Sequence, residues 1–194
     1  RGQWKPKVVI WENVKGVLDR DMIHSFRKYL RRMNELGYTN SYQVLNATDF
    51  GIPQRRERVF TVSMLGSRAF DFKRLKRKPM RHIDEFLEDD VNGKQYQITI
   101  PSMLNRIEEF NPTLSKKYRP LDVIDDSCWT ISTRQDRCPN AGIIKQIDGG
   151  YRYLTERECW RLMGFDDTDF ENALREFPSQ EGKRNATLYK QAGN

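Results

Sequence analysis

The alternation of hydrophobic and polar positions before residue 66 predicts a small sheet with one helix. Apolar residues recur at helical spacing between about positions 21 and 36, and Gly37 is well placed to end that helix. Its apolar stripe would comprise Met22, Phe26, Tyr29, Leu30, Met33 and Leu36. Three apolar segments have the length of strands, at residues 7–11, 42–45 and 59–65. We therefore expect strand, helix, strand, strand, which is part of an α/β sheet and too little of one to stand alone.

The pattern changes after the third of these strands, where short mixed segments and turn signals replace the long periodic ones. Residues 72–81 form a basic run with few apolar positions. Short helices are expected at residues 83–87 and 103–107, and a strand is expected at residues 129–132. Residues 66–150 are therefore interpreted as a separate, small and irregular domain.

Regular periodicity returns at residue 151. Thr155 and Glu158 have the spacing of a capping box, so a helix should begin there. Its apolar face would comprise Cys159, Leu162 and Met163. Gly164 would end this helix, and a last helix is expected over about residues 184–192.

The overall composition narrows the class of protein. With 194 residues, of which 37% are hydrophobic and 31% charged, the chain can bury a real core and is polar without being disordered. Its net charge of +7 favours a polyanionic partner, nucleic acid first. No apolar run approaches the ~20 residues needed to cross a bilayer, and the first residues do not resemble a signal peptide.

Cysteine and histidine content argues against disulfide and metal sites. The three cysteines, Cys128, Cys138 and Cys159, are odd in number and widely spaced, which is typical of a reducing cytoplasm. The histidines are His24 and His82, and no metal-ligand spacing is present. We therefore expect a cytoplasmic protein that uses neither a membrane nor a metal.

Residues 54–58, with the sequence Gln-Arg-Arg-Glu-Arg, combine a turn, three arginines and the start of a strand. Pro53 prevents a helix from continuing into this segment. Arg56 and Arg58 are two positions apart, so they should lie on one face, where they suit a phosphate, a carboxylate or a base edge. An exposed charged turn is the alternative interpretation of the same pattern.

Four blocks occur in order along the chain. They are Glu12-Asn13-Val14 after a strand, Gln54-x-Arg56-x-Arg58 before a strand, Arg152-x-Leu154-Thr155-x-x-Glu158-x-x-x-Leu162-x-Gly164-Phe165, and Tyr189-Lys190-Gln191-Ala192-Gly193-Asn194. With these blocks, and a basic region between the second and third, the chain resembles the C-terminal half of a DNA cytosine-5 methyltransferase. The resemblance implies an α/β fold, with a partial Rossmann-like S-adenosylmethionine-dependent methyltransferase sheet plus a small irregular target-recognition domain.

The resemblance also assigns domains and a reaction. Residues 1–65 would be the C-terminal part of the catalytic domain, and residues 66–150 the target-recognition domain. Residues 151–194 would supply a buttressing helix and return to the catalytic domain. The implied reaction transfers methyl from S-adenosylmethionine to C5 of a cytosine flipped out of a specific duplex DNA sequence.

The resemblance implies roles for three charged residues. In this family a cysteine thiolate attacks C6 of the cytosine, and C5 becomes nucleophilic. Glu12 matches the glutamate that holds N3 and the exocyclic amine. Arg58 matches the arginine that contacts the flipped base, and Arg56 would support the pocket electrostatically. Without the other blocks, Glu12 would be interpreted as a strand-end carboxylate that accepts a backbone hydrogen bond.

Four further residues complete the expected site. Asn13 and Val14 would shape the pocket wall, and Gln54 is assigned to the pocket, where it would brace the turn more than touch substrate. Asn194 is the one cofactor contact that the resemblance implies in this chain. The third block would buttress the recognition domain as a capped packing helix.

Candidate DNA contacts lie in the basic middle region. The stretch Thr133-Arg134-Gln135-Asp136-Arg137 carries side chains that pair with guanine or adenine edges, and Arg134 and Arg137 are its candidate DNA contacts. The candidates for binding phosphates are Lys73, Lys76 and Arg77. A solvated charged loop is the alternative interpretation of each set. The nearby aromatic residues Tyr118 and Trp129 are expected in the core.

The family's nucleophile lies in a Pro-Cys dipeptide of the N-terminal half, and no cysteine here follows a proline. The glycine-rich cofactor loop is also missing. The chain is therefore expected to be inactive alone, as a fragment, one subunit of a split enzyme or a degenerate remnant. Its start and end inside motifs favour a fragment. The expected partners are double-stranded DNA and the missing N-terminal half, in a bacterial or phage setting.

Two other functions fit parts of the pattern. An RNA cytosine-5 methyltransferase would share the pocket residues but usually has a smaller recognition region. A non-catalytic DNA-binding specificity subunit would share the basic middle region, yet it would not need Glu12 and Arg58 in register.

Overall fold

The computed structural model describes residues 5–108 and 120–194. The chain forms two compact units. The first comprises Arg1–Phe50 and Arg56–Pro79, and the second comprises Gly51–Arg55 and Met80–Asn194. The short segment Gly51–Arg55 therefore packs with the second unit, although its sequence neighbours on both sides belong to the first.

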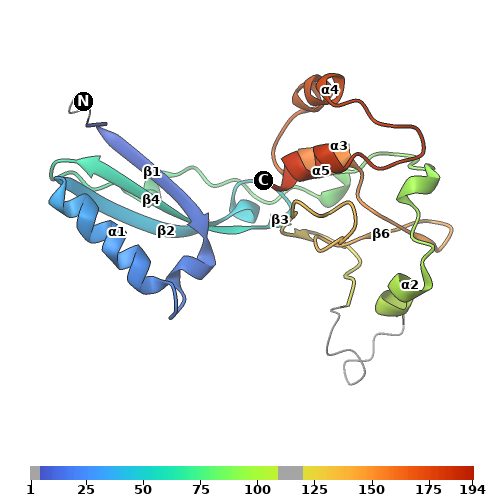
Figure 1. The fold of residues 1–194 in the computed structure, drawn as a ribbon, viewed down its shortest axis with the longest axis horizontal. Coiled ribbons are helices and arrows are strands. Elements are labelled where there is room, and N and C mark those ends of the chain that lie inside the picture. The colour runs from blue at the N-terminus through green and yellow to red at the C-terminus, as the bar shows by residue number, and fades with distance from the viewer. Residues whose placement is uncertain (1–4, 109–119) are drawn as a thin grey trace. The chain divides into compact units, whose positions relative to one another are not determined.

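The first unit contains a three-stranded sheet in the order β1-β4-β2 (Figure 1). Its strands are β1 (Val8–Val14), β2 (Tyr38–Asn46) and β4 (Glu57–Leu65), and β4 pairs antiparallel with both neighbours. The predicted order of strand, helix, strand, strand is confirmed. The first strand is longer than expected, because it continues through Glu12, Asn13 and Val14 instead of ending before them.

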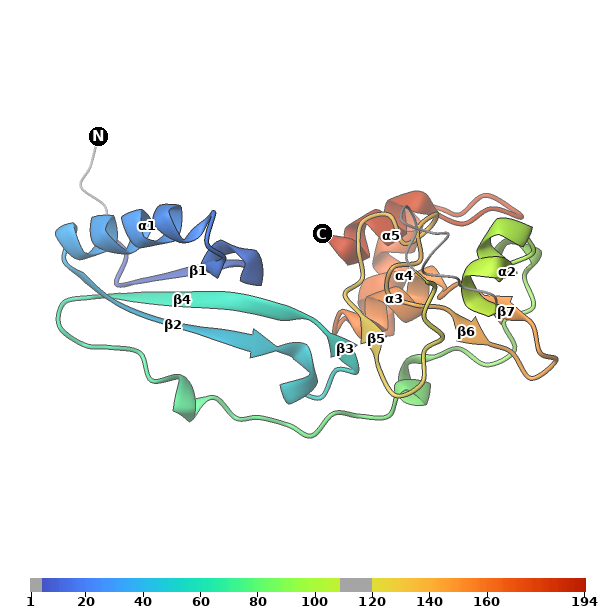
Figure 2. The same cartoon turned by 90° about the horizontal axis from the view of Figure 1, so that it is seen from below.

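One face of this sheet is covered by helix α1 (Ile23–Glu35), which follows the 3-10 helix η1 (Lys15–Leu18) (Figures 1 and 2). Phe26 of the helix packs with Val17 and Val59 in a buried cluster. Trp11 stacks on the same helix, with its ring centroid 5.5 Å from that of Phe26. The ends of the predicted stripe, Met22 and Leu36, are exposed, because the helix is shorter than its apolar pattern.

Residues 66–79, which include η3 (Phe72–Arg74), run along the opposite face of the sheet (Figure 2). The Phe70 amide donates to the Ser41 hydroxyl at 3.1 Å. At the far end of this segment, the Lys78 amide donates to the Asp49 carbonyl, in the turn that contains η2 (Ala47–Asp49). This part of the basic run thus packs with the sheet.

The second unit is built from short elements. Its strands pair as β3 (Gln54–Arg55) with β5 (Cys128–Trp129), in parallel, and as β6 (Ile144–Lys145) with β7 (Tyr151–Arg152), antiparallel. Its helices are η4 (Ile83–Phe86), η5 (Lys94–Tyr96), α2 (Pro101–Glu108), α3 (Glu156–Leu162), α4 (Asp167–Glu176) and α5 (Ala186–Gly193). The strand expected at residues 129–132 is only two residues long and begins one residue earlier.

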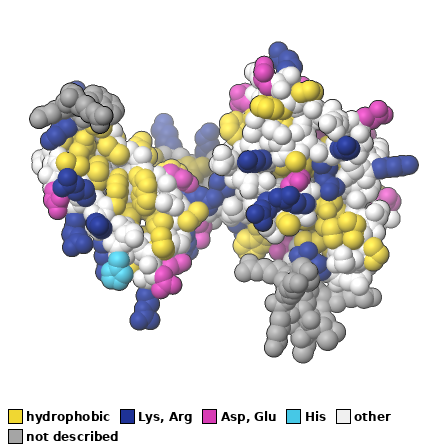
Figure 3. Space-filling view, viewed as in Figure 1, with side chains coloured by type: hydrophobic (Ala, Val, Ile, Leu, Met, Phe, Trp, Pro, Cys, Tyr) yellow, Lys and Arg dark blue, Asp and Glu magenta, His cyan; other side chains and the backbone are white. Residues whose placement is uncertain are grey.

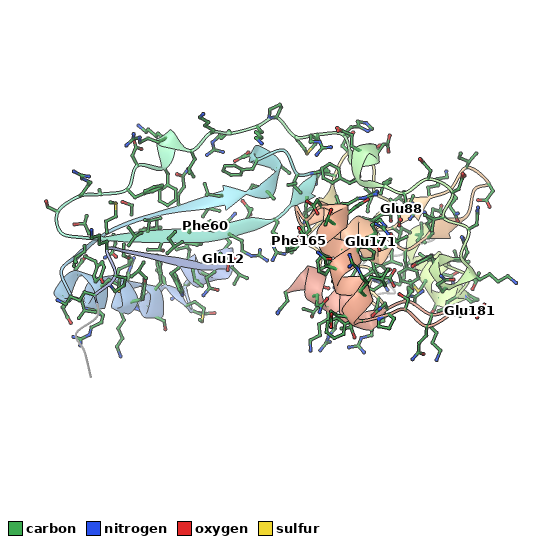
Figure 4. The ribbon with its side chains drawn as sticks, turned by 90° about the horizontal axis from the view of Figure 1, so that it is seen from above. Glu12, Phe60, Glu88, Phe165, Glu171 and Glu181 are labelled. Carbon is green, nitrogen blue, oxygen red and sulfur yellow. The ribbon has the colours of Figure 1, made fainter. Side chains whose placement is uncertain are left out.

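Helix α3 is the centre of the second unit. Thr155 and Glu158 form the predicted capping box, and Gly164 follows the helix with a φ of 91°. The Glu158 carboxylate is fully buried and binds the Arg152 guanidinium through two hydrogen bonds of 2.9 Å. On the outer side of α3, Arg157 forms ion pairs with Glu88 and Glu171, which Figure 4 labels.

The end of α5 lies against the backbone that follows β5. A Cβ atom added to Gly193 would lie 2.2 Å from the carbonyl carbon of Ser132 and 2.3 Å from the amide nitrogen of Thr133. No side chain fits there unless one of the two segments moves. The last helix and the loop that carries Arg134 are therefore in direct backbone contact.

Candidate active site

The predicted carboxylate and arginines come together on the face of the sheet opposite α1. Glu12 of β1 pairs in register with Phe60 of β4, and Leu45 of β2 pairs with Arg58 of β4. Directly opposed residues of antiparallel strands point to the same face, and Val59, between Arg58 and Phe60, packs toward α1. Figure 4 shows Glu12 and Phe60 on these neighbouring strands.

A cavity of about 350 Å³ lies at this position. It is lined by Glu12, Leu45, Asn46, Ala47, Phe50, Arg56, Arg58, Phe60 and Leu75. The lining combines aromatic and aliphatic walls with one carboxylate and two guanidinium groups. This composition is typical of a small-molecule site in which a few polar groups orient a largely apolar or aromatic ligand.

Glu12 and Arg58 form an ion pair inside the cavity. The Nε atom of Arg58 lies 3.0 Å from Oε1 of Glu12, and its Nη1 atom donates to the Glu57 carbonyl at 2.8 Å. The Arg58 side chain is only 16% exposed, whereas that of Glu12 is 48% exposed. The arginine is therefore fixed in the wall, and the carboxyl group remains accessible to a ligand.

Arg56 adds a second cation to the same cavity. Burial lowers the pKa of its guanidinium, the neighbouring Arg58 lowers it further, and Glu12 partly offsets both effects. The Asn46 side chain holds the backbone of this residue, because its Oδ1 atom accepts from the Arg56 amide at 3.0 Å. The cavity thus carries two cations for one carboxylate and favours an electron-rich or anionic ligand.

Asn46 also lines the cavity, and the sequence pattern does not predict this. Its Oδ1 atom also accepts from the Thr48 amide and caps the 3-10 helix η2. The available signal was an asparagine at the end of an apolar strand, followed by a turn. That pattern indicates a cap without showing that the amide faces a pocket.

Of the three other predicted pocket residues, Val14 is on the cavity's face of the sheet, directly opposite Arg58 in register, whereas Asn13 and Gln54 lie elsewhere. Asn13 is on the opposite face of β1 from Glu12 and accepts from the Val14 amide at 2.8 Å. Val14 is 52% exposed and is not among the residues that line the cavity. Gln54 is buried in the second unit, where it donates to the Leu162 carbonyl at 2.8 Å and accepts from the Ile131 amide.

The candidate DNA contacts divide between the two units. Lys73 and Lys76 are exposed on the segment that packs with the sheet. Arg77 of that segment forms an ion pair with Asp49 and lies over the Phe50 ring, so part of its charge is already neutralised within the protein.

Arg134 and Arg137 are exposed in the second unit, as a base-reading role requires. Gln135 between them is fully buried and accepts from the Ala141 amide, so its expected role as a reader is wrong. The expectation that Trp129 is in the core is also wrong, because this side chain is 46% exposed. Tyr118 lies outside the described residues.

The cysteines lack the surroundings of a nucleophile. Burial raises the pKa of Cys128 to about 12 and raises that of Cys159 as well. Cys138 is exposed and is not bound in a disulfide. Within residues 5–108 and 120–194, no cluster of His, Cys, Asp and Glu could hold a metal ion, and no helix is long and apolar enough to cross a membrane.

Comparisons with known proteins agree with the resemblance in the sequence. A model of the C-5 cytosine-specific DNA methylase family matches residues 2–194. The chain is 35% identical to the Type II methyltransferase M2.ScrFI of Lactococcus lactis subsp. cremoris, over 98% of this chain and 51% of that protein. It is 33% identical to the Type II methyltransferase M.HaeII of Haemophilus aegyptius, over 84% of this chain and 52% of that protein.

A solved structure shows the same fold. The Dnmt2 methyltransferase of S. pombe matches 98% of this chain and 62% of its own, with a TM-score of 0.69 and 21% identity. The chain spans about half the length of the curated relatives that it matches. The expected partial methyltransferase fold is confirmed, and the chain belongs to the C-5 cytosine-specific DNA methylase family.

Proposed function

We propose that this chain carries the cytosine pocket of a DNA cytosine-5 methyltransferase. The whole enzyme would transfer methyl from S-adenosylmethionine to C5 of a cytosine flipped out of a specific duplex sequence. The observation that carries this proposal is the cavity in which an accessible Glu12 carboxyl group is paired with the fixed guanidinium of Arg58. Residues 66–150 would contain the target-recognition domain, with Arg134 and Arg137 as readers and Lys73 and Lys76 as phosphate contacts.

The chemistry explains why these groups share a cavity. When a cysteine thiolate adds to C6, electron density moves through the pyrimidine ring toward N3 and the exocyclic amine. The Glu12 carboxyl group would share a proton with N3 and so stabilise that density. Arg58 would hold the carboxyl group in place and contact the base, and Arg56 would add positive potential. The flanking Phe60 and Leu45 would exclude water.

After methyl transfer, the proton at C5 is lost and the cysteine leaves C6, which restores the aromatic ring. S-adenosylmethionine, when bound, supplies the methyl group. In this chain only Asn194, at the end of α5, is assigned to the cofactor. The nucleophile and the rest of the cofactor site would come from the missing half.

The sheet offers a place for that half. In the described part of the chain, β1 pairs only with β4, so its outer edge has no strand beside it. Val8, Ile10 and Val14 of this strand are 46%, 68% and 52% exposed. Figure 3 shows hydrophobic side chains gathered over the part of the first unit where Figure 1 draws β1. The unpaired edge favours pairing with another strand, and the exposed apolar face beside it favours packing with another segment, as a fragment or a split subunit requires.

Glu12→Gln in the completed enzyme tests the pocket. The amide keeps the shape of the side chain but cannot share a proton with N3, so the rate of methyl transfer should fall by about 10²- to 10⁴-fold. The affinity for DNA should change little. The rate is measured by single-turnover methylation, and the affinity is measured by equilibrium binding to a duplex that contains the target site.

Glu57→Gln is the matched control. Glu57 is on the neighbouring strand, is 46% exposed and pairs with Lys15 at 2.9 Å, outside the cavity. The Glu57→Gln enzyme should methylate DNA at the wild-type rate. An unchanged rate for Glu12→Gln would remove Glu12 from the mechanism. Sequence-specific DNA binding without any methylation by the completed protein would instead support a non-catalytic specificity subunit.

A further inference from the structure

An exposed arginine is stacked on an exposed tryptophan in the second unit. Arg55 of β3 pairs in register with Trp129 of β5, and its guanidinium carbon lies 4.9 Å from the centre of the indole ring. The Nε atom of Arg55 donates to the Ser127 hydroxyl at 3.1 Å. The Thr130 hydroxyl donates to the Arg55 carbonyl at 2.9 Å, which fixes the backbone as well.

This guanidinium differs in its charge environment from those arginines of the described chain that form ion pairs. Ion pairs with carboxylates are formed by Arg32, Arg58, Arg77, Arg81, Arg152, Arg157 and Arg161. Among residues 5–108 and 120–194, no carboxylate pairs with Arg55, whose recorded side-chain partners are a hydroxyl group and an aromatic ring. The position is held, but the positive charge is not neutralised.

We propose that Arg55 and Trp129 form a preorganised contact for a phosphodiester group of the DNA substrate. The proposal rests on the proposed function, which supplies the polyanion. A stacked guanidinium keeps its Nη atoms free to donate in one plane, and this fork matches two phosphate oxygens. Because the ring already restricts the side chain, less conformational entropy is lost on binding than for a free arginine.

A phosphate suits this pair better than a base edge. The contact involves a side chain whose rotation is restricted by Trp129 and Ser127, and it is presented from a two-residue strand instead of a long loop. In sequence, Arg55 directly precedes Arg56 of the cytosine cavity. The proposed role is therefore to position DNA, without distinguishing one sequence from another.

The test is DNA binding by the complete enzyme as a function of salt concentration, with duplexes that contain or lack the target site. Arg55→Ala should weaken binding to both duplexes by about tenfold and reduce the slope of log K against log salt by about one. Trp129→Ala should give part of this loss, and Trp129→Phe should retain most of the affinity. Arg175→Ala is the control, because Arg175 is exposed on α4 and donates to the side chain of Asn172.

A double-mutant cycle tests whether the ring acts through the arginine. If Trp129 only orients Arg55, the double variant should bind no more weakly than Arg55→Ala alone. Additive losses would overturn the preorganised pair. An unchanged salt slope for Arg55→Ala, or a loss confined to the target duplex, would overturn the phosphate contact.

Failure of this contact can be told apart from failure of the proposed function. At subsaturating DNA, Arg55→Ala should lose methylation in proportion to its loss of DNA affinity, whereas the control Arg175→Ala should methylate at the wild-type rate. If Arg55→Ala weakens DNA binding as predicted but the wild-type protein never methylates DNA, the proposed function would be refuted and the phosphate contact would stand. Thermal unfolding of each variant shows whether a loss of affinity reflects a loss of folding, and Arg55→Lys, which keeps the charge, should recover part of the salt slope.

Discussion

At the scale of single residues, the buried carboxylate of Glu158 is a charge whose removal from water must be offset by hydrogen bonds. It accepts hydrogen bonds from the Glu88 amide, the Thr155 amide and both Nη atoms of Arg152. Each of its oxygens therefore has two partners, and the cost of burying the charge is offset by charge-assisted bonds. The arrangement holds three segments of the second unit together.

Glu158→Ala should destabilise the protein strongly, because it leaves the Arg152 guanidinium buried without its partner. The expected loss is about 3–5 kcal/mol of unfolding free energy. Denaturant unfolding measures this loss of free energy. Hydrogen exchange then shows whether α3 opens more readily in the variant. Glu171→Ala removes only an exposed partner of Arg157 and should cost less than about 1 kcal/mol. Equal losses for the two variants would contradict this account of Glu158.

The thiols make a second prediction at this scale. Burial raises the pKa values of Cys128 and Cys159, so neither forms a reactive thiolate near neutral pH. An alkylating reagent at about pH 8 should label the exposed Cys138 in the folded protein, and all three cysteines after denaturation. Mass spectrometry of timed samples reads the sites. Early labelling of Cys128 would show that β5 opens readily.

At the scale of elements, the sequence predicts those features whose signals are local. Thr155 and Glu158 predict the start of α3, because both halves of the capping box lie within four residues. Asp166 caps α4 by accepting from the Asp169 amide, and this signal is equally local. The pairing of β3 with β5 joins residues far apart in sequence, so no local pattern predicts its length or its partner.

Side-chain environment is predicted less well than element type. Glu12, Arg56 and Arg58 do share one cavity, because strand periodicity and register follow from the alternation of residues. Trp129 is exposed although its hydrophobicity predicts a core position, since hydrophobicity alone does not show that its partner is the arginine at position 55. Gln135 is buried although its polarity predicts exposure, because a polar side chain can be buried when backbone groups satisfy its hydrogen bonds.

The contact at the end of α5 gives a prediction for Gly193→Ala. In a free helix the change would be neutral or stabilising, by up to about 1 kcal/mol. Here the new methyl group would overlap the backbone of Ser132 and Thr133, so we expect a lower melting temperature and faster hydrogen exchange in residues 132–137. Gln191→Ala, at an exposed position of the same helix, controls for helix propensity. A stabilised Gly193→Ala would contradict the close contact.

At the scale of the molecule, the exposed face of β1 tests the proposal that a second half completes the enzyme. Ile10→Lys places a charge on the most exposed of the apolar side chains of this strand, and it should reduce recovery of methylation when the missing half is supplied. Circular dichroism of the chain itself should remain unchanged. Leu36→Lys, at an exposed position beyond α1, is the control. Methylation by the wild-type chain alone would overturn the need for a second half.

The packing of Gly51–Arg55 has a consequence for recombination between relatives. This segment lies within the first unit by sequence, yet β3 and the buried Gln54 belong to the second unit by their contacts. A chimera that exchanges recognition specificity by crossing over near Pro79 would import the second unit without the strand that β5 pairs with. A functional exchange should therefore graft Gly51–Arg55 from the same parent, as a second, five-residue insert upstream of the main crossover.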